Sequence, residues 1–88
     1  MISPTPRQLD LLRYIAGHIE AMGYAPRQID CAAALGIHQS GIVTVLGNLE
    51  GRGLIRRLHS HPRAIEVLHK PSIPRAPDGA PLYAVKLP

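Results

Sequence analysis

The order of apolar and polar residues near the N-terminus is typical of an amphipathic helix. Four apolar residues recur at helical spacing: Leu12, Ile15, Ala16 and Ile19. Such spacing places them on one helix face. Thr5 can cap this helix, because Gln8 completes a capping box with it and Pro6 fits the first turn. Gly23 supplies a left-handed exit, so we predict a helix from about Pro6 to Met22.

A shorter helix is predicted for the segment "YAPRQIDCAAALGI", with Pro26 at its beginning and Gly36 at its end. We expect its apolar contacts to come from four residues: Ile29, Ala32, Ala33 and Leu35. Cys31 lies among small residues without an obvious cationic neighbour, which favours a structural thiol over a reactive one. A lone cysteine cannot form an internal disulfide, which fits a reducing compartment.

The segment "HQSGIVTVLGNLEGRG" predicts a third helix, capped by Ser40 or Gln39. Its buried stripe is expected at Ile42, Val45, Leu46 and Leu49, which follow the spacing i, i+3, i+4 and i+7. The opposite face carries neither charge nor bulk: Ser40, Thr44, Gly47, Asn48 and Gly51. Glycine inside a helix costs about 1 kcal/mol relative to alanine. Gly47 therefore indicates either close approach to another surface or close packing against one of the first two helices.

Two alternating, β-branched stretches after this helix predict a hairpin, which spans Leu54–Leu58 and Ala64–Leu68 around a turn at Ser60–Arg63. Four prolines between residues 71 and 81 then exclude a regular helix and favour an extended, semi-rigid segment. Asp78-Gly79 is expected to form a turn, and "LYAVKL" a last strand. We divide the chain into a domain of residues 1–70 and a proline-rich tail of residues 71–88.

The charge of the chain is uneven. The formal net charge is +4, and the whole excess lies from Glu50 onward, where seven basic residues face three acidic ones. A basic half indicates a polyanionic partner, nucleic acid before membrane, although a merely soluble basic surface is the alternative. Aromatic residues are only 3% of the chain, so base stacking is not expected. The chain contains no apolar run long enough to suggest a signal peptide or a membrane span, so we expect a cytoplasmic protein.

Three helices followed by a hairpin is the order of a winged helix-turn-helix, a mainly α fold whose hairpin is called the wing. Four motifs occur in order along the chain: "T-x-R-Q" from Thr5, "G-x-x-P" from Gly23, "A-x-x-L-G" from Ala32 and "L-x-x-L-x-x-x-G-x-I" from Leu46. On these motifs the chain resembles the N-terminal DNA-binding domain of the LexA repressor family over about two-thirds of its length. The resemblance implies a nucleoid-associated, sequence-specific regulator of transcription, a repressor, that binds double-stranded DNA.

The chain departs from the LexA pattern in three places. The link between the second and third helices is about one residue shorter. LexA proteins continue into a self-cleaving and dimerising Ser–Lys domain, whereas this chain stops at Pro88, so we expect no self-cleavage. The tail has no counterpart in that resemblance, and we expect it to supply homodimerisation instead.

The resemblance implies that the third helix lies in the major groove and that the wing contacts the DNA backbone. This docking mode indicates two sets of candidate DNA-binding residues. Base-reading candidates are Gln39, Ser40, Thr44 and Asn48, whose amides and hydroxyls suit base edges. Phosphate-binding candidates are Arg27, Arg52, Arg56, Arg57 and Arg63. The alternative is that the polar residues are ordinary solvated positions and that some arginines pair with Glu50 or Glu66.

We expect neither an enzyme nor a cofactor or metal site. No paired carboxylates, nucleophile with base, or phosphate loop occurs at a recognised spacing. His59, His61 and His69 invite a metal-site interpretation, but contact with phosphate or solvent is favoured over it. The rival function is a winged-helix protein-interaction module, an adaptor or small inhibitor that does not read DNA sequence. The uncharged face of the third helix favours this rival.

Overall fold

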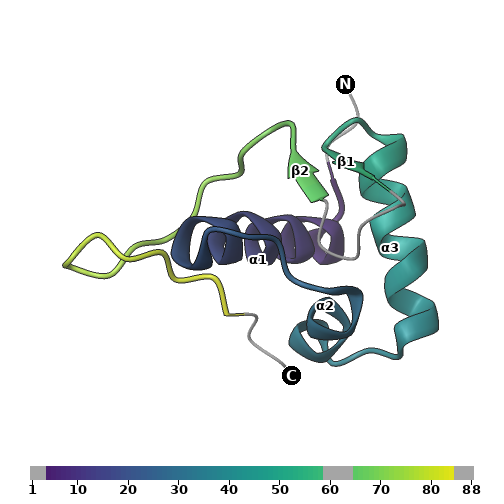
Figure 1. Cartoon of the computed structure of the whole chain (residues 1–88), viewed down its shortest axis with the longest axis horizontal. Coiled ribbons are helices and arrows are strands. Elements are labelled where there is room, and N and C mark those ends of the chain that lie inside the picture. The colour runs from purple at the N-terminus through teal and green to yellow at the C-terminus, as the bar shows by residue number, and fades with distance from the viewer. Residues whose placement is uncertain (1–3, 59–64, 85–88) are drawn as a thin grey trace.

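Three helices and a short hairpin follow one another along the chain (Figure 1). The computed structural model describes residues 4–58 and 65–84. The elements are α1 (Pro6–Met22), α2 (Gln28–Leu35), α3 (Gln39–Gly51), β1 (Ile55–Arg57) and β2 (Ile65–Val67). The strands pair antiparallel, with Ile55 opposite Val67 and Arg57 opposite Ile65. The predicted winged helix-turn-helix is therefore confirmed.

The ends of α1 are fixed by the predicted signals. The Thr5 hydroxyl accepts a hydrogen bond from the Gln8 backbone nitrogen at 3.2 Å, and the Gln8 side chain accepts one from the Thr5 nitrogen at 3.1 Å. Gly23 leaves the helix with a φ of 84°, in the left-handed region that glycine adopts without steric cost. Both predicted ends of α1 are confirmed.

The prediction for α2 was partly wrong. The helix begins at Gln28, two residues after Pro26, with Arg27 at the N-cap. Its inward face is made by Cys31, Ala32 and Leu35. This set of contacts turns Ile29 and Ala33 outward, and both are exposed instead of buried.

The beginning of α3 also differs from the prediction. His38 is the N-cap in place of Ser40 or Gln39, because its Nδ1 accepts the hydrogen bond from the Ser40 backbone nitrogen. The end of the helix is closed by a hydrogen bond from the Leu54 nitrogen to the Leu49 carbonyl, and Gly53 adopts a φ of 74° between them. The chain thus turns from α3 into β1 within a few residues.

One aliphatic core joins all three helices to the hairpin. Its buried members are Leu11, Leu12, Ile15, Cys31, Ala32, Leu35, Ile42, Leu46, Leu49 and Ile55. The predicted stripe of α3 is confirmed at Ile42, Leu46 and Leu49, which are fully buried, whereas Val45 is half-buried. Arg7 adds a polar tie, since its Nη1 donates to the Leu35 carbonyl at 3.0 Å and so satisfies the C-terminal end of α2.

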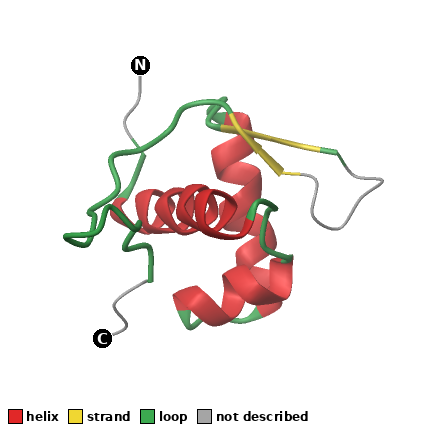
Figure 2. Cartoon of the chain, turned by 60° about the vertical axis from the view of Figure 1, so that its left-hand side comes forward, coloured by secondary structure: helices red, strands yellow, loops and turns green. Residues whose placement is uncertain are grey.

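The segment of residues 71–84, hereafter the strap, lies along α1. Figures 1 and 2 show it leaving the hairpin, passing the C-terminal end of α1, turning and coming back, on the side of α1 away from α3. The predicted turn is confirmed, with Gly79 at a φ of 90°. Of the predicted last strand, Leu82–Ala84 are described and do not form a strand. An isolated antiparallel bridge pairs Arg75 with Pro81, just before them.

Among the described residues, no single helix is long and apolar enough to cross a bilayer, and α2 with α3 would qualify only as a pair bent by 101°, by length and composition alone.

Candidate nucleic-acid interface

The outer side of α3 presents a row of small, uncharged side chains to solvent. The four predicted base-reading residues, Gln39, Ser40, Thr44 and Asn48, are all exposed. Three of them, Ser40, Thr44 and Asn48, lie opposite the buried stripe because a helix turns about 100° per residue. Gln39 lies in the first turn of α3, three residues before the buried Ile42 and on the same side as it. Val43 adds an exposed fraction of 48% next to Ser40. The structure therefore brings three of the four predicted residues together on one surface, which we call the α3 edge, with Gln39 at its N-terminal border.

Gly47 lies at the middle of the α3 edge. A Cβ atom added at Gly47 would meet nothing within 4 Å. This observation excludes the explanation that Gly47 allows close packing against α1 or α2. The other explanation open from the sequence, close approach to another surface, stays a prediction.

The first turn of the α3 edge is organised by His38. Its Nδ1 lies 3.1 Å from the Ser40 hydroxyl and 3.4 Å from the Ser40 backbone nitrogen. The backbone N–H can only donate, so the ring nitrogen is the acceptor in that bond. The Ser40 hydroxyl is thereby held in one direction before any partner arrives. His38 was not among the predicted site residues, because imidazole is not among the usual N-cap side chains.

Arg57 was predicted to bind phosphate, but its side chain pairs with Glu50 of the same chain. Its Nε and Nη2 donate to Glu50 Oε1 at 3.3 and 3.2 Å, and its backbone nitrogen donates to Glu50 Oε2 at 3.2 Å. Its side chain is only 15% exposed. The pair joins the last turn of α3 to β1, so Arg57 fixes the base of the wing.

Arg56 and Arg27 are also paired, but at the surface. Arg56 contacts Glu66 on the neighbouring strand, and its side chain is 62% exposed. Arg27 forms a two-pronged contact with Asp30 at 3.2 and 3.3 Å in the first turn of α2. Exposed pairs contribute about 0–1 kcal/mol, so a phosphate can replace either carboxylate at little cost. The sequence had named Glu50 and Glu66 as alternative partners, and both pairs form.

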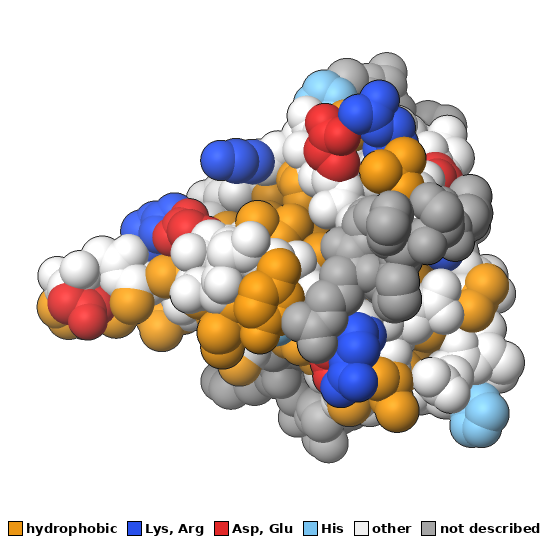
Figure 3. All heavy atoms as spheres, in the orientation of Figure 1, with side chains coloured by type: hydrophobic (Ala, Val, Ile, Leu, Met, Phe, Trp, Pro, Cys, Tyr) orange, Lys and Arg blue, Asp and Glu red, His pale blue; other side chains and the backbone are white. Residues whose placement is uncertain are grey.

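The structure says less about the other two predicted phosphate-binding residues. Arg52 is exposed at the C-cap of α3, while Arg63 lies outside the described residues. Figure 3 shows Lys and Arg side chains standing apart on this face, several beside carboxylates, around a largely uncharged surface over α3. The basic side chains seen on this face therefore do not join into one patch.

Two further possibilities from the sequence are a reactive Cys31 thiol and a metal site. Burial raises the pKa of the Cys31 thiol to about 12, which keeps it protonated and unreactive near neutral pH. Within residues 4–58 and 65–84, no group of three His, Cys, Asp or Glu side chains could hold a metal ion. His59 and His61 lie outside the described residues, so the structure does not test their contribution.

Comparison with known proteins decides the family. Residues 1–64 match the family model for the LexA DNA binding domain. The chain belongs to this family. It is 36% identical to the LexA repressor of Granulibacter bethesdensis over 86 residues, covering 91% of the chain and 36% of that protein. It is 35% identical to the LexA repressor of Bacillus subtilis over 99 residues, covering 98% of the chain and 48% of that protein.

Two consequences follow for this LexA-type chain. It spans between about a third and a half of the length of these curated relatives. The alignments with the two relatives cover 91% and 98% of the chain, so they include most of residues 71–88. The family model itself ends at residue 64, so residues 71–88 lie outside the DNA-binding domain that it describes.

Proposed function

We propose that the chain is a repressor that binds a specific sequence of double-stranded DNA, with α3 in the major groove and the wing on the phosphate backbone. Its DNA-binding unit would be residues 1–70. The observation that carries the proposal is Gly47, an energetically costly helix residue with open space above it at the centre of an uncharged edge. Membership of the LexA DNA-binding family and the printed names of the relatives support the same function.

The chemistry of the α3 edge suits direct reading of bases. Amide side chains such as Gln39 and Asn48 can pair with adenine, and Ser40 and Thr44 with several bases. Val43 offers a surface for the thymine methyl group. Since no arginine occurs within α3, we infer a site richer in A·T than in G·C pairs at the positions that α3 reads.

Phosphate binding is assigned to four of the five predicted arginines: Arg27, Arg52, Arg56 and Arg63. Arg57 is withdrawn from this set because its guanidinium is committed to Glu50. Each neutralised phosphate contributes about −0.9 to the slope of log affinity against log salt. The expected slope is thus about −3.6.

Selection from a pool of random duplexes tests the proposal, followed by titration of the selected duplex and a scrambled duplex at several salt concentrations. A shared sequence should emerge, with the selected duplex bound much more tightly and both showing the salt dependence. Weak, flat binding without any enriched sequence would favour the protein-interaction module. Reduced reporter expression from a promoter carrying the selected site would separate repression from activation.

Homodimerisation through the C-terminal segment belongs to the same proposal. A helix-turn-helix reads one half-site, and two copies reading a palindrome gain both affinity and specificity. Leu82, on the strap, is 55% exposed and available for such a contact. Sedimentation of the whole chain and of Leu82→Glu, alone and with the selected duplex, should show a dimer only for the unaltered chain. A repressor of this kind acts at the bacterial nucleoid, by binding and not by catalysis.

A further inference from the structure

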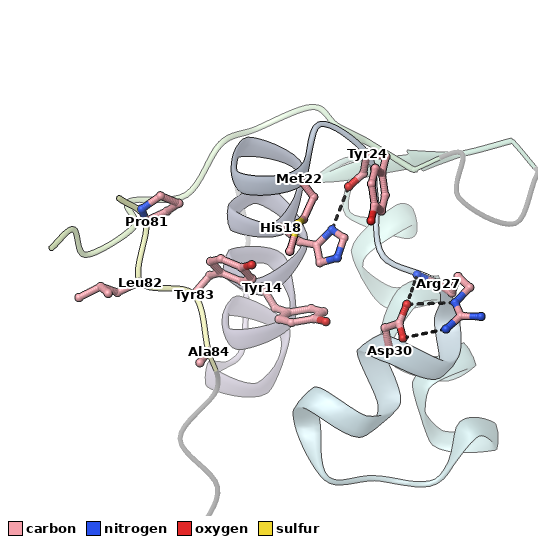
Figure 4. A pocket seen from close by; sticks show the side chains of 10 residues that line it. All are labelled: Tyr14, His18, Met22, Tyr24, Arg27, Asp30, Pro81, Leu82, Tyr83 and Ala84. Atoms are coloured by element: carbon pink, nitrogen blue, oxygen red, sulfur yellow. Dashed lines mark hydrogen bonds and ion pairs between the residues drawn. The ribbon is translucent and has the colours of Figure 1, made fainter. Parts of the chain in front are cut away.

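The three tyrosines of the chain gather around one hollow, although the sequence places them far apart. Phe and Trp are absent from the sequence. Tyr14 comes from α1, Tyr24 from the loop after it and Tyr83 from the strap, and Figure 4 shows His18 between them. The hollow they line has a volume of about 710 Å³. An aliphatic core thus coexists with an aromatic cluster on the opposite side of α1 from α3.

The rings contact one another in an arrangement that favours attraction. Tyr83 lies with its ring centroid 5.8 Å from that of Tyr14 and 6.3 Å from that of His18, tilted by 49° and 80°. These values fall in the range of attractive edge-to-face pairs. His18 is itself held in place, because its Nδ1 donates to the Tyr24 backbone carbonyl at 2.9 Å. The Tyr83 ring therefore contacts side chains whose positions are already set.

Gly17 forms the floor beneath Tyr83. A Cβ atom added at Gly17 would overlap the Cβ, Cγ and Cδ1 atoms of Tyr83. These atoms are at the root of the tyrosine side chain, so a rotation of the ring cannot relieve the overlap and the strap backbone would have to move. A helix gives up stability by holding glycine in its interior. Gly17 is therefore the residue that opens this place for a ring.

Two polar ties hold the rest of the strap on the same helix. Arg75 donates to Glu20 of α1, with Nη2 and Oε1 2.8 Å apart. Arg13 of α1 donates from Nε to the Ser72 carbonyl at 3.1 Å. Together with the Tyr83 contact, these bonds attach both arms of the strap to α1.

The strap continues directly from the wing strand. Ile65 and Val67 of β2, Ile19 of α1 and Ile73 of the strap line a second hollow, of about 370 Å³. An isolated pair of short strands is at best marginally stable, so β2 depends on what packs beside it. The strap supplies Ile73 at that place and is itself anchored at Tyr83.

We propose that Gly17, Tyr14 and His18 form a ring socket for Tyr83, and that docking of the strap in this socket holds the wing in its DNA-binding position. The socket itself is independent of the proposed function; only the effect on DNA rests on it.

Matched alanine substitutions in the two helices test the socket in the full chain. Gly47→Ala should raise the midpoint of thermal unfolding by about 4–8 °C through helix propensity alone. Gly17→Ala should lower the midpoint below that of the unaltered chain and shift the ring resonances of Tyr14 and His18. An equal rise for both variants, with unchanged ring resonances, would overturn the socket.

Substitutions of Tyr83 test the coupling to the wing without altering α1. Tyr83→Phe keeps the ring and should behave as the unaltered chain. Tyr83→Ala should make the β1 and β2 amides exchange with solvent about tenfold faster and weaken binding of the selected duplex about threefold or more. Ala80→Ser, a change at another exposed position of the strap, is the control and should leave exchange unaltered.

The outcomes separate the two proposals. If the unaltered chain binds no duplex selectively, the proposed function fails while ring resonances and amide exchange still decide the socket. If the unaltered chain binds its duplex and Tyr83→Ala matches it in amide exchange and affinity, the inference about the strap is wrong.

Discussion

Gly17 in α1 and Gly47 in α3 are both glycines inside an α-helix, yet one is covered by another side chain and the other is open. The root of the Tyr83 side chain occupies the space above Gly17, while the space above Gly47 is open to at least 4 Å. Each glycine costs its helix about 1 kcal/mol relative to alanine. One helix recovers this cost by packing against its own chain, and the other leaves the space unfilled.

The difference shows how the two sides of the molecule are used. The strap side is completed within the chain, by aromatic contacts and by ties from Arg13 and Arg75. The α3 edge is uncharged and small, with Arg52 at the C-cap of its helix. An unfilled helix face of this kind is suited to a surface that must come close, and the polar floor of the wide major groove is such a surface.

The largest expected effect comes from filling the open space. Gly47→Leu should leave the fold intact, since nothing lies near its Cβ, but should weaken binding of the selected duplex by at least about 100-fold, or about 2.7 kcal/mol. Titration of the labelled duplex measures this. Ala21→Leu, at an exposed position on α1, is the control and should retain full affinity. Undiminished binding by Gly47→Leu would show that α3 does not approach DNA closely.

A pair of neighbouring arginines separates structure from binding on the wing side. Arg57→Gln removes bonds to Glu50 at a side chain that is only 15% exposed, and should destabilise the fold by about 1–3 kcal/mol. Arg56→Gln should change stability by less than about 1 kcal/mol and reduce the salt slope by about 0.9. Thermal unfolding and salt titration of both variants measure the two effects. Equal stabilities for the two variants would contradict the assignment of Arg57 to the base of the wing.

The smallest effect concerns acid and the strap side. The hydrogen bond from Arg75 lowers the pKa of Glu20 below its ordinary value of 4.5. Because the folded state favours the ionised carboxylate, this contribution to stability is complete above about pH 4.5 and is lost as the pH falls through the lower folded pKa. Glu20→Gln should therefore unfold at a lower temperature than the unaltered chain at pH 7, and the gap should close on acidification. A gap that stays constant down to pH 3 would show that the pair does not hold the strap.

The sequence predicted those parts of the fold that depend on neighbouring residues. Thr5, Gln8 and Gly23 mark the ends of α1 through local hydrogen bonds and backbone freedom, and the structure confirms them. The buried stripe of α3 also follows from local spacing. Ile29 was wrongly placed inside because the rotation of a short helix is set by its packing partners, and a helix of eight residues carries too few apolar positions to fix it.

The contacts that the sequence could not predict join distant residues. Arg75 and Glu20 are 55 positions apart, and no periodicity links Gly17 to Tyr83. The placement of the candidate residues followed from the sequence more closely on α3, where all four base-reading candidates lie on one helix, than among the arginines. Whether an arginine such as Arg57 points to solvent or back to Glu50 depends on how α3 meets β1, which only the folded chain decides.

The placement of the tyrosines gives the molecule a natural optical probe. With Trp absent from the sequence and every tyrosine beside the strap, ultraviolet emission from the unlabelled chain originates solely from that side. Its intensity and polarisation can follow detachment of the C-terminal segment in real time, without a dye, while α3 contributes no signal of its own.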